Sequence, residues 1–112
     1  MRKMGVNMKS PINVKHWTKG DVKGIHFTTN GWVISAIMGN TVYSSYNGDD
    51  AFNPDCEIAL WRTSDNKMIE IENDTVKGWV EWGNVIDLVE WIRVQDETPD
   101  EDAVRFIIQT FC

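Results

Sequence analysis

An imidazole and two hydroxyl groups are the side chains whose spacing first suggests chemistry. His26, Ser35 and Ser44 recur at equal intervals along the chain, and in a meander with tight turns they fall side by side on one face of a sheet. An imidazole beside a hydroxyl is the pair that nucleophilic catalysis uses, but no carboxylate in this pattern orients the ring. We therefore predict no catalytic residue. The row is interpreted as a polar strip facing solvent, an interface or a ligand, to which it contributes hydrogen bonds.

Arg105 is the second candidate, because a guanidinium can hold a phosphate through two parallel hydrogen bonds. It follows residues 96–102, DETPDED, which composition predicts to be a mobile, self-repelling loop. The alternative is a salt bridge between Arg105 and that acidic loop.

The chain has six tryptophans, an unusual number for 112 residues. Trp79, Trp82 and Trp91 fall near a predicted helix, and two of them are expected in the core. A tryptophan left unburied could stack on a purine or anchor a subunit interface.

Metal and cofactor sites of the usual kinds are not predicted. The histidines and cysteines, at positions 16, 26, 56 and 112, lack the spacing of metal ligands. Neither GxxxxGK nor GxGxxG occurs, so nucleotide hydrolysis and dinucleotide binding in the usual modes are unsupported.

The net charge of -6 is unevenly distributed. Residues 1–30 hold six Lys or Arg against one Asp, and the remainder holds five against sixteen acidic residues. An acidic body argues against binding to duplex nucleic acid, which requires neutralised phosphates. The binding partners still compatible with this charge are a protein with a basic surface, or a small ligand that contacts a few local cations.

Tight turns must position these side chains. Asn30-Gly31 and Gly39-Asn40 are typical of two-residue hairpin loops, and alternation predicts an earlier strand at 12–17. The expected strands of the meander are 24–29, 32–38 and 41–46. The expected facing pairs are Phe27 with Ile34, Ile25 with Ala36, and Ala36 with Tyr43.

A second hairpin is predicted around Asp65-Asn66, with Leu60 opposite Ile71 and Arg62 opposite Ile69. Residues 75–82 form a further short strand, with Gly78 as a bulge.

Asn84 is the expected N-cap of a helix that runs to about Gln95, with Val85, Leu88, Val89 and Ile92 on its buried face. Alternation over 104–109 predicts a closing strand.

The expected fold is therefore α+β: an antiparallel sheet of about six to eight strands, one main helix near the C-terminus and a final C-terminal strand. Residues 1–112 form a single domain, of which 1–10 are a flexible N-terminal segment. No apolar run is long enough for a membrane helix or secretion signal, so a cytoplasmic location is expected.

The segments VISAIMGNTVYSS, EIALW and KGWVEWGNVIDLVEWI resemble small phage-encoded anti-defence proteins. The order of antiparallel sheet, late helix, loop and arginine is similar to that of the Thoeris anti-defence sponge family. That family sequesters cyclic ADP-ribose isomers without cleaving them, in pockets between subunits. The resemblance implies that Arg105 contacts phosphate and that Trp79 or Trp82, with Asn84, contacts the base.

Three functions follow as hypotheses. The first is a homo-oligomeric, non-enzymatic sponge for a cyclic nucleotide signal in the host cytoplasm. The alternative is an acidic inhibitor that blocks a host defence or nucleic-acid-binding protein with residues 96–102 and exposed tryptophans. A hydrolase built on His26 comes third.

Overall fold

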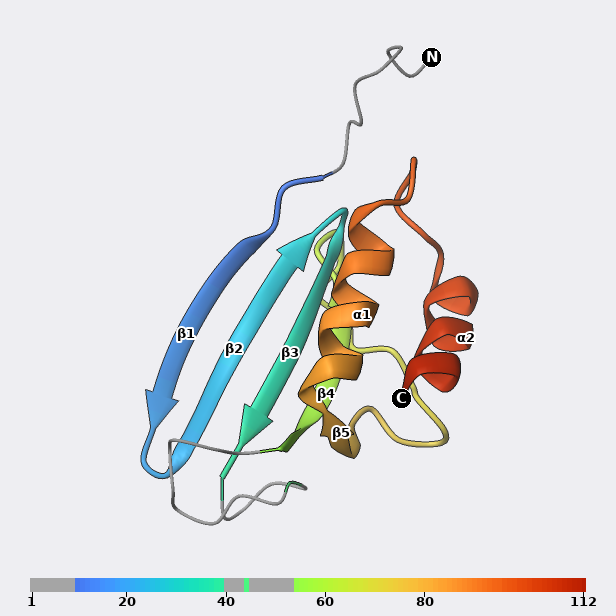
Figure 1. Cartoon of the computed structure of the whole chain (residues 1–112). Coiled ribbons are helices and arrows are strands. Elements are labelled where there is room, and N and C mark those ends of the chain that lie inside the picture. The colour runs from blue at the N-terminus through green and yellow to red at the C-terminus, as the bar shows by residue number, and fades with distance from the viewer. Residues whose placement is uncertain (1–9, 40–43, 45–53) are drawn as a thin grey trace.

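The computed structural model describes residues 10–39, 44 and 54–112, which fold as a five-stranded antiparallel sheet with two helices. The strands lie across the sheet in chain order, and α1 packs over the sheet with α2 beside it (Figure 1). The elements are β1 Asn13–Lys19, β2 Val22–Thr29, β3 Trp32–Met38, β4 Asp55–Arg62, β5 Lys77–Glu81, α1 Trp82–Arg93 and α2 Glu101–Phe111. The α+β class is confirmed, but the described residues contain five strands instead of six to eight.

Two-residue turns set the register of the first three strands. Asn30 and Gly31 have φ values of 48° and 83°, which is the positive pair that a tight β2–β3 hairpin requires. The predicted pairs Phe27 with Ile34 and Ile25 with Ala36 are confirmed.

The predicted pairing of Ala36 with Tyr43 is wrong. β3 has β2 on one side and β4 on the other, and on the β4 side Ala36 lies opposite Ile58. The expected strand 41–46 falls outside the described residues except for Ser44, which is part of a bend.

The second predicted hairpin is replaced by a turn and an irregular return. Trp61 bridges to Met68, and the Ile69 amide donates to the Leu60 carbonyl at 3.0 Å, so the predicted pairs of Leu60 and Arg62 are wrong. The return is not a regular strand because Ile71 bridges instead to Asp74 in a tight local turn.

β5 runs directly into α1, which begins at Trp82 and has Glu81 as its N-cap. Asn84 is therefore inside the first turn and is not the cap. The predicted buried face, Val85, Leu88, Val89 and Ile92, is confirmed.

The C-terminal segment is a helix, and the predicted closing strand is wrong. Asp100 caps α2 by accepting a hydrogen bond from the Ala103 amide at 2.8 Å. Val104 and Ile108, one helical turn apart, are fully buried, whereas Phe106 between them is 65% exposed. Alternation would bury all three, so packing selects the helical spacing.

Helix α2 packs against α1, and both belong to the core that covers β3 and β4. The segment between the helices is fastened to the β2–β3 turn: the Asn30 side chain donates to the Ile92 and Gln95 carbonyls, and the Trp32 indole donates to that of Pro99. Residues 96–102 are thus partly tied down, and the last two begin α2.

Of the predicted N-terminal segment 1–10, only Ser10 is among the described residues; its amide donates to the Arg93 carbonyl. Neither helix in the described ranges is long and apolar enough to cross a membrane.

Candidate functional site

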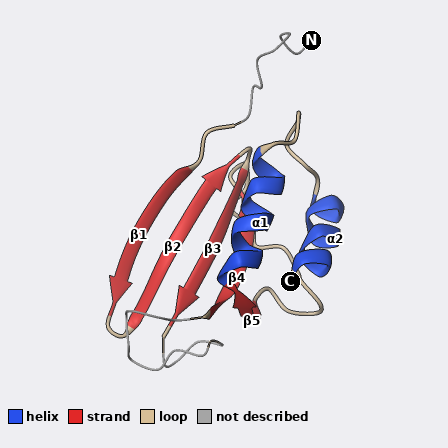
Figure 2. Cartoon of the chain, in the orientation of Figure 1, coloured by secondary structure: helices blue, strands red, loops and turns tan. Residues whose placement is uncertain are grey.

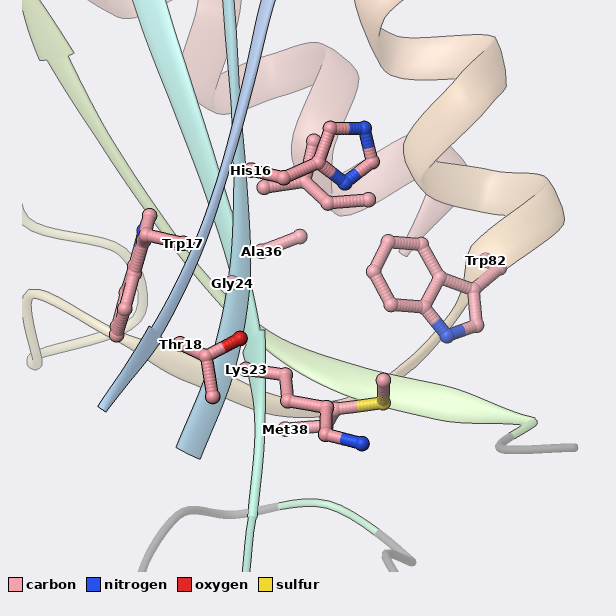
Figure 3. Close-up of a pocket in the computed structure, with 9 residues that line it drawn as sticks. His16, Trp17, Thr18, Lys23, Gly24, Ala36, Met38 and Trp82 are labelled. Carbon is pink, nitrogen blue, oxygen red and sulfur yellow. The ribbon is translucent and has the colours of Figure 1, made fainter. Parts of the chain in front are cut away.

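An open groove lies where the helices stop covering the sheet. β1 and β2 present alternate side chains to the helix side, and Trp82 projects from the start of α1 toward them (Figure 3). We call this cleft the β1–α1 groove. It has a volume of about 180 Å³ and is lined by His16, Thr18, Lys23, Ile25, Ala36, Met38 and Trp82, with Trp17 and Gly24 at its border.

The groove combines apolar walls with a polar mouth. Ile25, Ala36 and Trp82 supply apolar surface, while His16 and Lys23 supply an imidazole and an ammonium group. Trp82 is only partly buried, packed against the core on one side. An indole that has one face on the core can stack a planar ring on its other face.

The opposite face of the sheet carries the predicted polar row, but only in part. His26 lies opposite Ser35, as predicted, and Ser35 lies opposite Ala59 on its other side. Ser44 is therefore not a member of the row.

His26 is packed edge-on between two indoles, with ring centroids 6.1 Å from Trp17 and 5.3 Å from Trp61. Burial, together with the nearby charge of Lys15, lowers the pKa of His26 below its ordinary value. The ring is thus favoured in its neutral form, as a packed aromatic group.

Trp17 can lie over β2 because residue 24 is glycine. A Cβ at position 24 would stand 2.4 Å from the indole Cε2 of Trp17. A glycine inside a strand commonly marks such a close approach.

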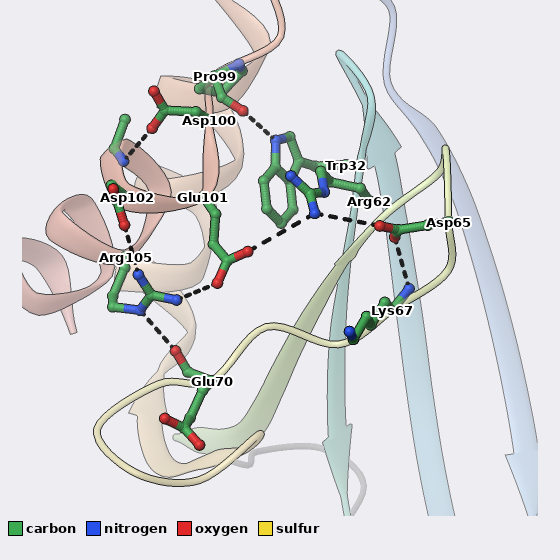
Figure 4. A network of polar contacts seen from close by, with 11 residues as sticks. Trp32, Arg62, Asp65, Lys67, Glu70, Pro99, Asp100, Glu101, Asp102 and Arg105 are labelled. Atoms are coloured by element: carbon green, nitrogen blue, oxygen red, sulfur yellow. Dashed lines mark hydrogen bonds and ion pairs between the residues drawn. The ribbon is translucent and has the colours of Figure 1, made fainter.

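Arg105 forms the predicted salt bridge and belongs to α2. Its Nε donates to the Glu70 carbonyl at 2.8 Å, one terminal nitrogen donates to Asp102 at 3.0 Å, and the other pairs with Glu101 (Figure 4). The alternative interpretation of this residue, a salt bridge to the acidic segment, is confirmed. A phosphate would have to displace these partners.

A second cavity of about 400 Å³ lies over this network. Arg62, Lys67 and Arg105 line it together with three carboxylates, Asp65, Glu70 and Glu101. Because positive and negative groups are equal in number, the cavity offers an anion little net attraction.

The two candidate tryptophans differ. Trp82 reaches the β1–α1 groove, whereas Trp79 does not line it, is 62% exposed and has a φ of 53°. A positive φ is unusual for a bulky residue. Asn84 is half-buried in the first turn of α1.

Sequence reasoning missed His16, Thr18 and Lys23 as groove residues. The sequence shows that these residues alternate along two strands, but it does not show which part of the sheet the helices leave uncovered.

Comparison with protein-family models, with curated proteins and with solved structures gave no match.

Proposed function

We propose that the protein is a non-enzymatic binding protein that captures a nucleotide-type signal by its planar ring in the β1–α1 groove. The observation that supports this most directly is the Trp82 indole at one wall of an apolar cleft that also contains an imidazole and a cation. In this proposal Trp82 stacks on the base and His16 borders the ring.

The charge around the groove suits an anionic ligand better than the charge of the whole chain does. Lys23 lines the groove, whereas Lys15 and Lys19 lie on the other face of β1, and Asp21 is the one acidic residue of β1, β2 and the turn between them. The acidic residues are concentrated in the later half of the sequence. We assign the phosphate to Lys23, with the Thr18 hydroxyl beside it.

The size of the groove limits what one subunit can hold. Pockets for drug-sized ligands have volumes of roughly 300 to 1,000 Å³, whereas this groove has about 180 Å³. It suits one ring system, and the rest of a cyclic ADP-ribose type of ligand would extend beyond it. A pocket completed by a second subunit, as in the Thoeris anti-defence sponges that the sequence resembles, fits this limit. The role is then sequestration of a defence signal in the host cytoplasm.

The test is calorimetric titration of the protein with cyclic ADP-ribose isomers, AMP and inorganic phosphate, followed by heat release and mass analysis of the retained ligand. Trp82→Ala should weaken binding about 5- to 150-fold, because base stacking on an aromatic ring contributes about 1–3 kcal/mol. The ligand should be recovered intact.

Trp79→Ala is the matched control, since it removes an exposed indole outside the groove. Arg105→Ala separates the groove from the site that the family resemblance implies. Loss of binding in Arg105→Ala with unchanged binding in Trp82→Ala would reject the groove, and recovery of a cleaved product would reject a non-enzymatic role.

A protein inhibitor is the second candidate, supported by the outer surface of α2. Phe106 is 65% exposed one helical turn after Asp102, whose side chain is 95% exposed. An aromatic side chain beside carboxylates is a common anchor for a basic partner. In this case Phe106→Ala, and not Trp82→Ala, would release the target, and association would slow as salt is raised.

A further inference from the structure

Among the residues that the structure describes, β1 is an edge strand of the sheet. It pairs with β2 on one side, its other side forms the boundary of the sheet (Figure 2), and six of its seven residues are exposed. Unpaired amides and carbonyls along an edge are a template for another strand.

The turn identifies which backbone groups are unpaired. Gly20 and Asp21 form a two-residue loop closed by Lys19 opposite Val22, and the closing pair of such a loop is hydrogen-bonded. Bonded and non-bonded pairs then alternate, so the odd-numbered residues of β1 bond to β2. The amides and carbonyls of Val14, His16 and Thr18 point outward.

We propose that β1 pairs with β1 of a second copy of this chain, antiparallel about a two-fold axis at His16. The two five-stranded sheets then become one continuous sheet. A self-complementary interface of this kind closes as a symmetric dimer.

Charge selects this register among those that the backbone allows. About His16, Lys15 lies opposite Trp17 of the second copy, and Lys19 lies opposite Asn13. Every lysine of β1 thus faces an uncharged residue, and all seven residues pair. The two registers next to it place Lys15 opposite Lys15 or Lys19 of the second copy, and like charges directly opposite are destabilising. More distant registers pair only three residues of each strand.

The dimer also extends the groove, and this part of the argument rests on the proposed function. His16 and Thr18 line the groove and lie at the joint between the sheets. The two grooves therefore open on the same face of the joined sheet, on either side of the axis. A ligand larger than one ring reaches the second subunit.

Cross-linking tests the register directly. In the proposed pairing, position 13 lies opposite position 19 in a non-bonded pair, whose Cα atoms are about 4.5 Å apart, within the range of a disulfide. Tagged Asn13→Cys mixed with untagged Lys19→Cys should give a disulfide-linked heterodimer under mild oxidation. Each variant alone is the control, because its two cysteines lie at opposite ends of the paired strands.

The natural cysteines should contribute little background. Burial raises the pKa of Cys56 to about 12 and that of Cys112 to about 11, so few reactive thiolates are present at pH 8.

Sedimentation provides the second measurement. His16→Pro removes an outward amide without removing a bond to β2 and should sediment as a monomer, whereas His16→Ala should remain a dimer. A wild-type protein that sediments as a monomer, or equal cross-linking in the mixture and in the single variants, would overturn the proposal. This holds also if the β1 edge is found to bind an acidic peptide instead of a second copy. Ligand titration of the wild-type protein, with its sedimentation measured under the same conditions, separates the two claims: a dimer that binds no nucleotide refutes only the proposed function, and a monomer that binds one refutes only the dimer.

Discussion

The two halves of the sheet's helix-facing surface, the β3–β4 side and the β1 side, differ in how far the helices cover them. On the β3–β4 side, Ile34, Ile58 and Leu60 are fully buried beneath the helices. On the same face at the β1 side, Val14 is 48% exposed, and Ile12, just before β1, is 38% exposed. Exposed apolar side chains beside an open strand edge are typical of an interaction surface.

We therefore expect different residues to determine the stability of the protein and its binding to partners. The covered side carries the continuous core, so its residues should dominate the free energy of unfolding. The open side contributes little buried area, and its side chains are available for a ligand or a second subunit.

The largest expected effect contrasts the two sides directly. Leu60→Ala should lower the free energy of unfolding by about 2–5 kcal/mol, because it leaves a cavity in the core. Val14→Ala should change it by less than about 0.5 kcal/mol, as an exposed substitution does. Urea denaturation, at a protein concentration where both variants are monomeric, measures the two values. Similar losses would show that the open side is part of the core.

A smaller effect concerns how β1 is held to β2. Gly24→Ala should destabilise the protein by about 1–3 kcal/mol, because the new methyl group collides with the Trp17 indole. In a Trp17→Ala background the same change should be neutral or stabilising, since alanine suits a strand better than glycine does. A double-mutant cycle checks this reversal of sign. Additive losses would mean that the two residues do not interact.

The cap of α2 should contribute about 1 kcal/mol. Asp100→Ala removes the acceptor of the Ala103 amide, and such losses are about 0.5–2 kcal/mol. Asp100→Asn is the matched control, because asparagine caps equally well. Thermal unfolding followed by circular dichroism compares the variants, and equal losses in both would point to lost charge instead of a lost cap.

Local turn chemistry explains why the first hairpins could be predicted. Asn30 and Gly31 tolerate positive φ, and a two-residue loop leaves one register for the strands on either side. That register correctly placed His26 beside Ser35. It could not place Ser44, because the strand beside β3 comes from later in the chain.

The C-terminal helix was missed because its apolar residues fit both the two-residue period of a strand and the period of about 3.6 residues of a helix. Val104, Phe106 and Ile108 alternate, yet Val104 and Ile108 also lie one helical turn apart. Packing against α1 decides between the two. A local signal did exist, since Asp100, a common N-cap residue, is followed by the acidic residues Glu101 and Asp102, as is typical of a first helical turn.

The groove depends on where the helices lie, which the strand pattern does not determine. A helix is roughly 10 Å wide and strands lie about 4.8 Å apart, so one helix covers about two strands. The fold expected from the sequence, with one helix over six to eight strands, therefore already implied that part of the apolar face is uncovered. Only the position of α1, which contacts β2 as well as β3, identifies that surface as β1 and part of β2, and with it His16 and Lys23 as groove residues.

The smallest expected effect completes the comparison, because it concerns the charged contacts on the covered side. Arg105→Ala should lower the free energy of unfolding by about 1 kcal/mol or less, since partly exposed ion pairs contribute little. The loss should shrink in concentrated salt, which screens the pairs. Arg93→Ala, which breaks a comparable pair with Glu90 on α1, is the control. Arg105 does not line the β1–α1 groove, so ligand affinity should be unchanged in Arg105→Ala, and a fall in affinity without a fall in stability would place the ligand at α2.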